Sequence, residues 1–563
     1  GMDMVFCHGP VDSFTKIKVD DRGAWAGTVS GQTSIAILQP ELFGGESREG
    51  GVTGNVDILC GHSTQTKNDY LVSKLGSLVP AFRGVASIVL RQVYVGLNPY
   101  LKKWSARIQR IHVRQNGIEQ WYDEKAEIKN YKELIGAGNL NWRYKVVALT
   151  DISDYSAADY DDTSWPVGPS PIADKSWPSN DSGSPSYYGF ASDPGTTVPQ
   201  QRKVWLRTEI NLTSVGSSFF FDSFVDNGIE VWVNGQKVVT NYETYGHYFG
   251  VNIPGSYFVV GQNEIAVLGR DDSLGERPNN WFYFDLRLRD TSATISDMNP
   301  AHIIRECLTD PLWGMGYQDS DIDDDSFIYA ANRLYSEGMG MSILWDTQTS
   351  IEEFVKIVIQ HIDAALFVDR QTGKFVLKLI RDDYTEGDLI LLNESNIDKV
   401  ADFTRPAFGE LTNSVTVTFW NAELEETSSV TVQDIALAQE QGATINTTVT
   451  YEGFTNPSLV SRVAQRDLKT LSTPLVSCTI YANRDAANLN IGDVFKFSWA
   501  DYEVSEMVMR VTGIAYGDGK SNRIRIQCAQ DVFALPDVSF VPSTPPVLED
   551  PSGTPIAVSK RIL

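Results

Sequence analysis

Apolar and polar residues alternate along the first part of the chain, as in β-strands. Examples are Ile17-Lys18-Val19 and Ile35-Ala36-Ile37, and turn clusters such as Gly44-Gly45-Glu46 separate these runs. An apolar run over residues 80–90 indicates a buried strand, and a further strand is expected over 104–113. We therefore predict that residues 2–127 form the first part of a β-rich domain.

The pattern changes between residues 128 and 297. Residues 151–199 are crowded with Asp, Ser, Pro and Gly and also carry several aromatic residues. Short apolar segments follow at 204–210, 217–221, 228–233, 263–268 and 281–288. The Asn234-Gly235 pair is typical of a two-residue hairpin turn, and short strands at this spacing favour a β-sandwich or jelly roll. We predict that residues 128–297 are such a domain, inserted into the surrounding β-rich and α+β sequence.

At residue 299 the hydrophobic period changes from two residues to 3.6, which indicates helix. Asn299 can cap a helix and Pro300 suits the first helical position. A second helix is expected over residues 325–337, with Gly338 as its stop. These signals begin an α+β domain predicted over residues 298–400.

A third helix has the best-defined start in the chain. Ser350 and Glu353 form a capping-box pattern. Apolar residues then recur on one helical face, at Ile351, Phe354, Val355, Val358 and Ile362. Two apolar segments flank a turn with Gly373, so we expect a β-hairpin packed on this helix.

The C-terminal part returns to strand patterns. Strands are expected at 414–419, 476–481, 494–499, 507–511 and 522–528, with one helix over 458–471. We predict a β-rich domain over residues 401–540 and a Pro-rich tail or linker over 541–563. The predicted fold class is therefore multidomain, mainly β with an α+β part.

Composition narrows the classes of function. The formal charge of the 563 residues is −25, so a surface that neutralises nucleic-acid phosphates is not expected. Five cysteines without a CxxC pair argue against a disulfide framework or a zinc ribbon, and favour buried free thiols. No apolar run approaches the ~20 residues of a membrane helix and no signal peptide is evident. We predict that the protein is made in a cytoplasm and does not insert into a membrane.

The sequence carries no recognisable motif for catalysis or for metal or cofactor binding. The 72 acidic residues show no pattern that selects a glycosidase pair, and the six histidines are scattered. Aspartates alternate at 319, 321, 323 and 325 and could suggest calcium. That segment lacks the Gly and the distal Glu of an EF-hand loop and precedes a helix, so helix capping is the better interpretation. We predict no enzyme activity, no cofactor and no metal.

Several motifs outside residues 128–297 resemble the central hub proteins of bacteriophage tail tips and baseplates. The motifs are Cys7-His8-Gly9-Pro10-Val11-Asp12, Ala81-Phe82-Arg83-Gly84, Asn98-Pro99-Tyr100, Asn299-Pro300-Ala301-His302, Trp313-Gly314-Met315-Gly316, Asp369-Arg370-Gln371-Thr372-Gly373 and Ile491-Gly492-Asp493-Val494. The resemblance implies β-barrel-like domains that assemble into a ring, usually threefold, at the end of the tail tube. It also implies other tail proteins as partners, a homotrimer, and a place in the virion tail.

The insertion resembles galactose-binding-type jelly rolls. Its motifs are Asp161-Asp162-Thr163-Ser164-Trp165, Val204-Trp205-Leu206-Arg207, Asp226-Asn227-Gly228-Ile229 and Gly261-Gln262-Asn263-Glu264. In such domains the first Trp and the Asn-Gly hairpin are commonly structural. A cell-surface glycan is therefore a candidate ligand of other residues in the insertion.

Sugars are bound by aromatic rings, which stack on C–H faces, and by fixed polar groups, which hydrogen-bond to the hydroxyls. The candidate rings are Trp177, Tyr187, Tyr188, Tyr245 and Trp281, with Asp222 and Asn280 as hydrogen-bonding partners. The alternative is that these rings fill the sandwich core or pack against the rest of the protein.

Three classes of function remain. The first is a structural tail-tip or baseplate hub component, involved in tail assembly and host attachment, whose jelly roll binds surface carbohydrate. The alternative is a secreted carbohydrate-active protein with an accessory binding domain, or a free-standing lectin-like module. A secreted enzyme would need a signal peptide and a carboxylate pair in a cleft, and a lectin would leave the hub-like motifs unexplained.

Overall fold

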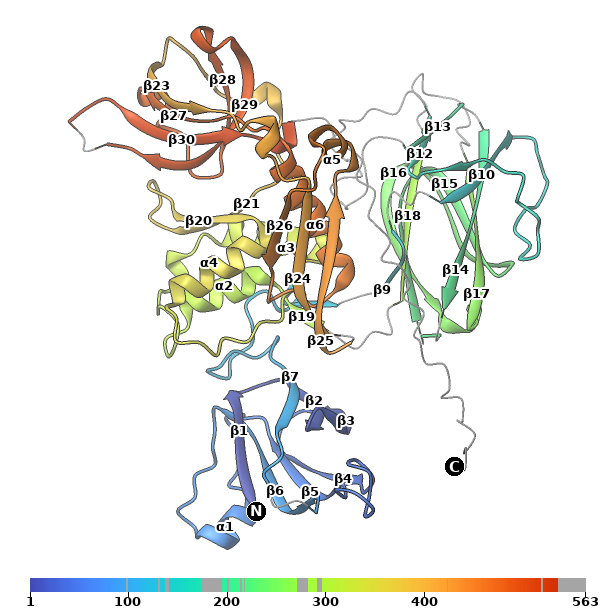
Figure 1. Ribbon diagram of the computed structural model, residues 1–563, viewed down its shortest axis with the longest axis vertical. Coiled ribbons are helices and arrows are strands. Elements are labelled where there is room, and N and C mark those ends of the chain that lie inside the picture. Colours follow the sequence, from blue (N-terminus) through green and yellow to red (C-terminus); the bar gives the residue numbers. More distant parts are fainter. Residues whose placement is uncertain are drawn as a thin grey trace, which may run out of the picture. The chain divides into compact units, whose positions relative to one another are not determined.

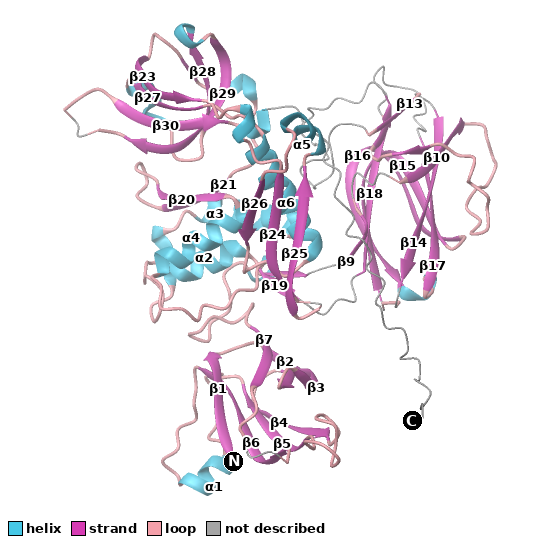
Figure 2. Ribbon diagram, in the orientation of Figure 1, coloured by secondary structure: helices cyan, strands magenta, loops and turns pink. Residues whose placement is uncertain are grey.

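The computed structural model describes most of the chain. The described residues are 1–97, 100–129, 132–136, 141–174, 195–199, 202–212, 215–216, 218–270, 282–290, 296–422, 424–517 and 520–534. The predicted tail at 541–563 lies outside them. Two compact units, Gly1–Leu379 and Ile380–Leu563, divide the chain and are treated separately below. Strands form most of the secondary structure in both units, which confirms the mainly β fold class (Figure 2).

The first unit begins with two antiparallel sheets around one core. A four-stranded sheet has the order β1-β6-β5-β4, and a three-stranded sheet has the order β3-β2-β7. The strands are β1 (Met2–His8), β2 (Ser13–Val19), β3 (Arg22–Val29), β4 (Thr33–Gln39), β5 (Val52–Leu59), β6 (Val85–Val95) and β7 (Trp104–Gln109). Phe14 and Ile17 of one sheet share the core with Val56 and Ile88 of the other. A short helix, α1 (Asp69–Leu75), was not predicted.

The strands of the predicted jelly roll form one ten-stranded sheet that encloses its own core (Figure 1). Its order is β11-β10-β14-β17-β15-β18-β12-β13, with β16 paired to β15 and β9 paired to β18. The strands are β9 (Lys132–Ile135), β10 (Trp142–Ala148), β11 (Val167–Gly168), β12 (Ile172–Asp174), β13 (Thr196–Val198), β14 (Arg202–Leu212), β15 (Ser218–Val233), β16 (Gln236–Pro254), β17 (Gly261–Arg270) and β18 (Tyr283–Asp290). The predicted hairpin turn is confirmed, with φ of 50° at Asn234 and 77° at Gly235.

Strand β15 corrects one sequence-based prediction. We expected two separate strands, at 217–221 and 228–233, with polar residues such as Asp222 and Asp226 between them. The chain instead continues as one strand, with a register shift between Val225 and Asn227 where it pairs with β16. The first part of β15 pairs with β18 and its last part pairs with β17. The polar residues therefore mark a change of neighbour rather than a turn.

The chain enters and leaves the jelly-roll strands through a two-stranded ladder. β8 (Glu127–Lys129) pairs with β19 (Ser296–Met298), so residues 169 positions apart in the sequence are hydrogen-bonded neighbours. Next to this ladder, the backbone N–H of Asn299 donates to the carbonyl of Ala126 at 2.8 Å. Both ends of the intervening segment are thus fixed at one place.

Three helices follow, and each predicted boundary is confirmed to within one residue. α2 (Pro300–Thr309) is capped by Asn299, and α3 (Asp324–Glu337) ends at Gly338 with a φ of 63°. α4 (Ile351–Ile362) has the full capping box of Ser350. The hairpin of β20 (Ala364–Val368) and β21 (Phe375–Leu379) completes this region.

The second unit contains two sheets. A six-stranded sheet has the order β22-β28-β29-β30-β27-β23, and its outermost strands are joined by only a short connection, so the sheet curls around a single core (Figure 1). Its strands are β22 (Leu391–Leu392), β23 (Ile397–Thr404), β27 (Ser477–Ala482), β28 (Val494–Trp499), β29 (Val504–Ala515) and β30 (Ile524–Gln530). The smaller sheet has the order β25-β24-β26 and packs on the predicted helix α6 (Pro457–Ser472). Its strands are β24 (Ser414–Asn421), β25 (Glu426–Gln433) and β26 (Asn446–Thr450), with α5 (Ile435–Gln441) between the last two.

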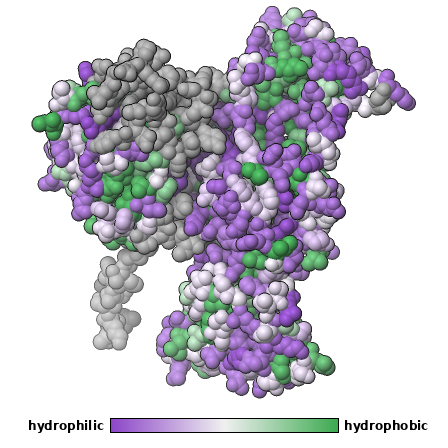
Figure 3. All heavy atoms as spheres, turned by 180° about the vertical axis from the view of Figure 1, so that it is seen from behind, coloured by the Kyte–Doolittle hydropathy of each residue, from purple (hydrophilic) through white to green (hydrophobic). Residues whose placement is uncertain are grey.

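Hydrophilic residues predominate on the face seen in Figure 3, with smaller separate apolar areas. This distribution agrees with the formal charge of −25. Within the described part of the chain, no helix is long and apolar enough to cross a membrane.

Candidate binding site on the jelly roll

The structure describes only part of the predicted sugar site. Trp177, Tyr187, Tyr188, Asn280 and Trp281 lie outside the described residues. Tyr245 lies in β16, and only its backbone is described. The role proposed for these residues therefore stays a prediction.

Asp222 is described, and its surroundings indicate a structural role. Its side chain is 0% exposed on β15. Both carboxylate oxygens accept hydrogen bonds from Nε of Arg287 on the neighbouring strand β18, at 3.2 and 3.3 Å, and Arg289 lies 3.9 Å away. A buried carboxylate needs such partners because an unpaired charge is costly in the interior. A sugar could reach Asp222 only by displacing an arginine of the sheet.

An aromatic cluster covers the outer side of strands β10, β14, β15 and β17. The loop between β10 and β11 contributes Tyr155, Tyr160 and Trp165, which pack on Trp205 and Trp232. The ring of Tyr155 lies edge-on to Trp165 and Trp205, with centroids 5.6 and 5.7 Å apart. Such edge-to-face pairs add to the stabilisation from burial alone. The three Trp side chains are buried, so the expectation that Trp165 is structural is confirmed.

A buried arginine fastens this loop to the sheet. Arg207 on β14 is 1% exposed. Its guanidinium donates to the backbone carbonyl of Tyr155 at 2.6 Å and to Oδ2 of Asp162 at 3.1 Å, and it lies 3.2 Å from Oε1 of Glu264. Asp162 also accepts a bond of 2.5 Å from Arg143. These contacts hold both ends of the loop segment that carries Tyr155 and Tyr160.

Glu264 is the titratable group of this cluster whose charge is sensitive near neutral pH. Burial raises its pKa to about 7, and the nearby Arg207 charge partly opposes this effect. The negative charge of Asp162 adds to the rise. The Glu264 carboxyl under the loop therefore gains or loses its charge within the physiological pH range.

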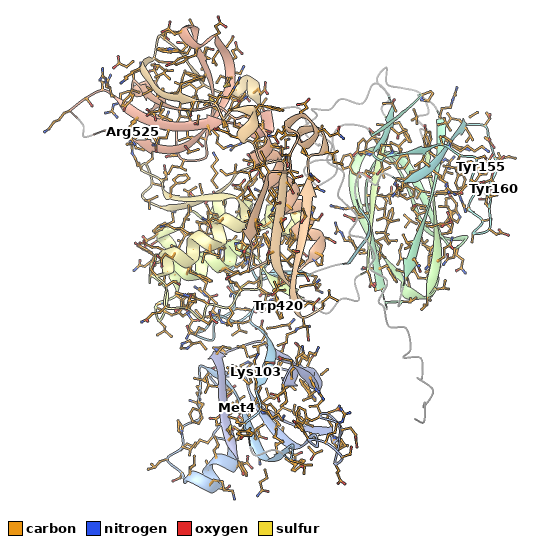
Figure 4. All side chains as sticks on the ribbon, in the orientation of Figure 1. Met4, Lys103, Tyr155, Tyr160, Trp420 and Arg525 are labelled. Atoms are coloured by element: carbon orange, nitrogen blue, oxygen red, sulfur yellow. The ribbon has the colours of Figure 1, made fainter. Side chains whose placement is uncertain are left out.

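Tyr155 and Tyr160 are functional candidates that the sequence analysis did not single out. They lie side by side on the loop (Figure 4), with ring centroids 5.3 Å apart, and both are partly exposed. Nζ of Lys145 lies 4.2 Å from the Tyr155 ring, and its hydrogen bond to Tyr155 raises the pKa of Lys145. Two tyrosines within one Asp- and Ser-rich loop were the available sequence signal. Together these groups offer ring edges, hydroxyls and a cation at the surface of the jelly roll.

A second polar cluster lies where α2 meets the chain that precedes the jelly roll. A small pocket there, with no room for a water molecule, is lined by Arg114, Gln120, Trp121, His302, Arg305 and Glu306. Glu306 accepts from Gln120 at 3.1 Å and pairs with Arg110, and Arg305 pairs with Asp319 and Asp324. Burial lowers the pKa of His302 to about 4, so its imidazole is neutral at pH 7. These charged groups are engaged with one another, which is typical of a structural junction.

The acidic run before α3 serves as helix capping and ion pairing. Oδ1 of Asp323 accepts from the backbone N–H of Ser326, and Asp321 accepts from the backbone N–H of Gln318. Asp319 and Asp324 pair with Arg305, at 2.9 and 3.0 Å. The capping interpretation is confirmed.

Part of the chain matches a known protein family. Residues 350–514 match a family described as putative phage tail protein. This match confirms the resemblance to phage tail proteins, and with it the expected place in a virion tail. No curated protein matches the sequence.

Solved structures with similar parts are distant. A tail protein from Neisseria meningitidis MC58 is 10% identical, with 58% of this chain and 97% of that chain covered and a TM-score of 0.30. The virion of a native gene transfer agent particle gives 11% identity, 60% and 81% coverage and a TM-score of 0.28. A glycosyl hydrolase family 2 member from Bacteroides cellulosilyticus gives 19% identity, with 28% of this chain covered and a TM-score of 0.19. This chain spans only 20% of that enzyme's length, and none of these likenesses carries a functional conclusion.

Proposed function

We propose that this chain, a phage tail protein by the match over residues 350–514, is a component of the tail-tip or baseplate hub whose jelly roll serves host attachment. Its partners in this role are other tail proteins and further copies of itself, arranged as a homotrimer. The jelly roll, residues 128–297, is an insertion into the hub sequence, and its ligand is a cell-surface glycan. The chain acts by assembly and binding, without catalysis.

The single observation that carries this proposal is the way the chain closes around the jelly roll. β8 and β19 form a ladder directly before and after the jelly-roll strands. Three side chains from the segment before the ladder then bond to the helices after it. Arg114 donates to Thr309 at 2.5 Å, Gln120 donates to Glu306 at 3.1 Å, and Tyr122 donates to Asn332 at 2.8 Å.

These bonds join residues that are 186 to 210 positions apart in the sequence. The segment before the jelly roll is therefore bonded directly to α2 and α3. A module attached in this way can be exchanged or lost while the surrounding fold persists, as suits a part that contacts a variable host surface. Its interior is a separate hydrophobic core, so it does not depend on the hub for burial of its apolar residues.

The glycan proposal rests on the residue types of the insertion. Neutral sugars bind to aromatic faces and to hydrogen-bonding groups, and the sequence of residues 128–297 supplies both. Trp177 and Tyr188 stand as the principal ring candidates, with Tyr187, Tyr245, Trp281 and Asn280 beside them. Tyr155 and Tyr160 add described, partly exposed rings on the loop after β10. Asp222 is assigned to the sheet interior because Arg287 holds it there.

A glycan array with the full chain tests this proposal. The test variant is the double substitution Trp177→Ala and Tyr188→Ala. The matched control is Trp420→Ala, which removes a ring that is 47% exposed on β24 in the second unit. We expect the full chain and the control to bind the same glycans and the double variant to lose that binding, with thermal unfolding unchanged. Binding to no glycan, or equal loss in the control, would overturn the carbohydrate role.

A further inference from the structure

The six-stranded sheet of the second unit brings two cysteines into contact. Cys478 on β27 and Cys528 on β30 are direct partners in the antiparallel register, although 50 residues separate them in the sequence. Their Sγ atoms are 3.5 Å apart. Both side chains point into the core of this sheet, where they are 4% and 2% exposed.

This contact distinguishes the pair from the other cysteines. All five cysteines are free thiols and lie in the described part of the chain. Cys60, for example, has only backbone partners for its sulfur, the N–H of Gly31 at 3.2 Å and the carbonyl of Val29 at 3.8 Å. Among these five described cysteines, Cys478 and Cys528 are the two whose thiols are in contact. The odd cysteine count and the missing CxxC motif concealed this pair at the level of sequence.

We propose that Cys478 and Cys528 are an oxidation site that closes to a cross-strand disulfide when the protein meets a peroxide. Directly opposed residues of antiparallel strands have Cβ atoms about 4.5–5.5 Å apart. A disulfide requires a Cβ separation of about 3.5–4.5 Å and an S–S bond of about 2.05 Å. Closure therefore needs side-chain rotation and an ångström-scale approach of two strands that are already hydrogen-bonded. No strand has to change its partner or its register.

The reaction has two steps that balance. The thiolate of Cys478 attacks one oxygen of hydrogen peroxide, the O–O bond breaks, and a sulfenic acid forms. The departing hydroxide takes the proton that the thiol released, which gives the first water. The sulfur of Cys528 then attacks the sulfenic sulfur, its S–O bond breaks, and the departing oxygen leaves as the second water with the Cys528 proton. Two thiols are oxidised and one peroxide is reduced.

The environment assigns the roles of the two sulfurs. A hydrogen bond from the Cys528 thiol lowers the pKa of Cys478, whereas the same interaction and burial raise the pKa of Cys528. Cys478 is also the more exposed of the two, at 4% against 2%, so we assign it as the sulfur that the peroxide reaches first and Cys528 as the resolving thiol. The small size of a peroxide suits a pair that is nearly closed to solvent. The disulfide would tie β27 to β30 and close the chain between them into a loop.

The redox setting decides when the bond forms. Cytoplasmic thiols are kept reduced, and disulfides persist in oxidising surroundings. The pair would remain a dithiol while the chain folds and would close after exposure to oxidant. This inference rests on the second unit alone and is independent of the proposed role in host attachment.

An oxidation experiment on the native full chain tests the proposal. The chain is treated with hydrogen peroxide, the peroxide is removed, and the free thiols are counted after denaturation. We expect the free thiols to fall from five to three, and a digest to contain one linked peptide that joins Cys478 to Cys528 and is two hydrogens lighter than its parts. Dithiothreitol should restore all five. A wild-type chain that keeps both thiols alkylatable, or oxidises them without linking them, would overturn the proposal.

Two variants make the outcome specific. Cys528→Ser should form no linked peptide, and a sulfenic-acid trap should label Cys478 instead. Cys307→Ser is the matched control, because Cys307 is also fully buried but does not belong to the contacting pair. This control should still lose two thiols and give the linked peptide. Linkage of another cysteine pair in either variant would contradict the assignment.

Discussion

Removal of the Asp162 carboxylate should release the loop that covers the outer face of the jelly roll. Arg207 is almost completely buried, and it holds the loop through Asp162 and the carbonyl of Tyr155. Asp162→Ala leaves the guanidinium with the Tyr155 carbonyl and Glu264 as its remaining partners. The variant therefore weakens the link between loop and sheet without touching the hydrophobic core.

The size of the effect follows from the burial of the pair. Removal of one partner from a buried ion pair costs ~3–5 kcal/mol when the other charge is left uncompensated. Here Glu264 can compensate in part, because loss of the Asp162 charge lowers the pKa of Glu264 and favours its ionised form. We therefore expect a cost of about 2 kcal/mol, which is about a 30-fold increase in the open population of the loop.

Hydrogen exchange followed by mass spectrometry measures this opening directly. The amides of residues 149–166 should exchange about 30-fold faster in Asp162→Ala, while those of β14 and β17 keep their protection. Asp161→Ala is the matched control. The neighbouring Asp161 is exposed, and its side chain accepts only from Thr163, at 3.1 Å from the backbone N–H and 2.6 Å from the hydroxyl.

Equal exchange in the two variants would refute the reasoning, because it would mean that Arg207 does not hold the loop through Asp162. Faster exchange throughout the jelly roll would also refute it. In that case the pair would stabilise the whole domain rather than the loop.

Three further predictions concern charge and capping. His302 has a folded-state pKa of about 4 against an ordinary 6.5, so its contribution to stability is present above pH 6.5 and is lost as pH falls towards 4. In unfolding measured as a function of pH, the wild type should lose about 3 kcal/mol over this range. His302→Gln should not show this loss. Glu264 has a raised pKa of about 7 against an ordinary 4.5, so its contribution to stability is present below pH 4.5 and is lost as pH rises through 7. Glu264→Gln should remove this loss. If the unfolding midpoint of Glu264→Gln depends on pH as that of the wild type does, the assignment is contradicted. Ser350→Ala should destabilise α4 by about 1 kcal/mol in denaturant unfolding, whereas Ser336→Ala within α3 should change stability less, since only Ser350 caps a helix.

Local signals in the sequence predicted the helical region well. Asn299, Gly338 and the Ser350 capping box act within one helical turn, so their meaning does not depend on the rest of the fold. The Asn234-Gly235 turn was equally clear, because a two-residue hairpin needs residues that tolerate positive φ. The family resemblance added the tail assignment, which the family match confirms.

Features that depend on distant pairing could not be predicted. The segments 217–221 and 228–233, predicted as two strands, form one strand because β18 and β17 pair with successive parts of β15. Asp222 was interpreted as a sugar ligand because its arginine partner could not be foreseen. That partner lies 65 residues later and is brought to Asp222 by the register of neighbouring strands. The contact of Cys478 with Cys528 depends on register in the same way. For the predicted sugar-binding rings, the chemistry of the residue types remains the only basis.

The central claim, that this chain lies at the tail tip, is tested most directly by immunogold labelling. A gold-labelled antibody against the jelly roll is located by electron microscopy on virions that carry this chain. The account predicts gold at the end of the tail that is distal to the head. The number of labelled sites per virion should be a multiple of three, since the hub is proposed to be a homotrimer. Label along the tail tube, label on the head, or unlabelled virions that contain the protein would contradict placement at the tail tip.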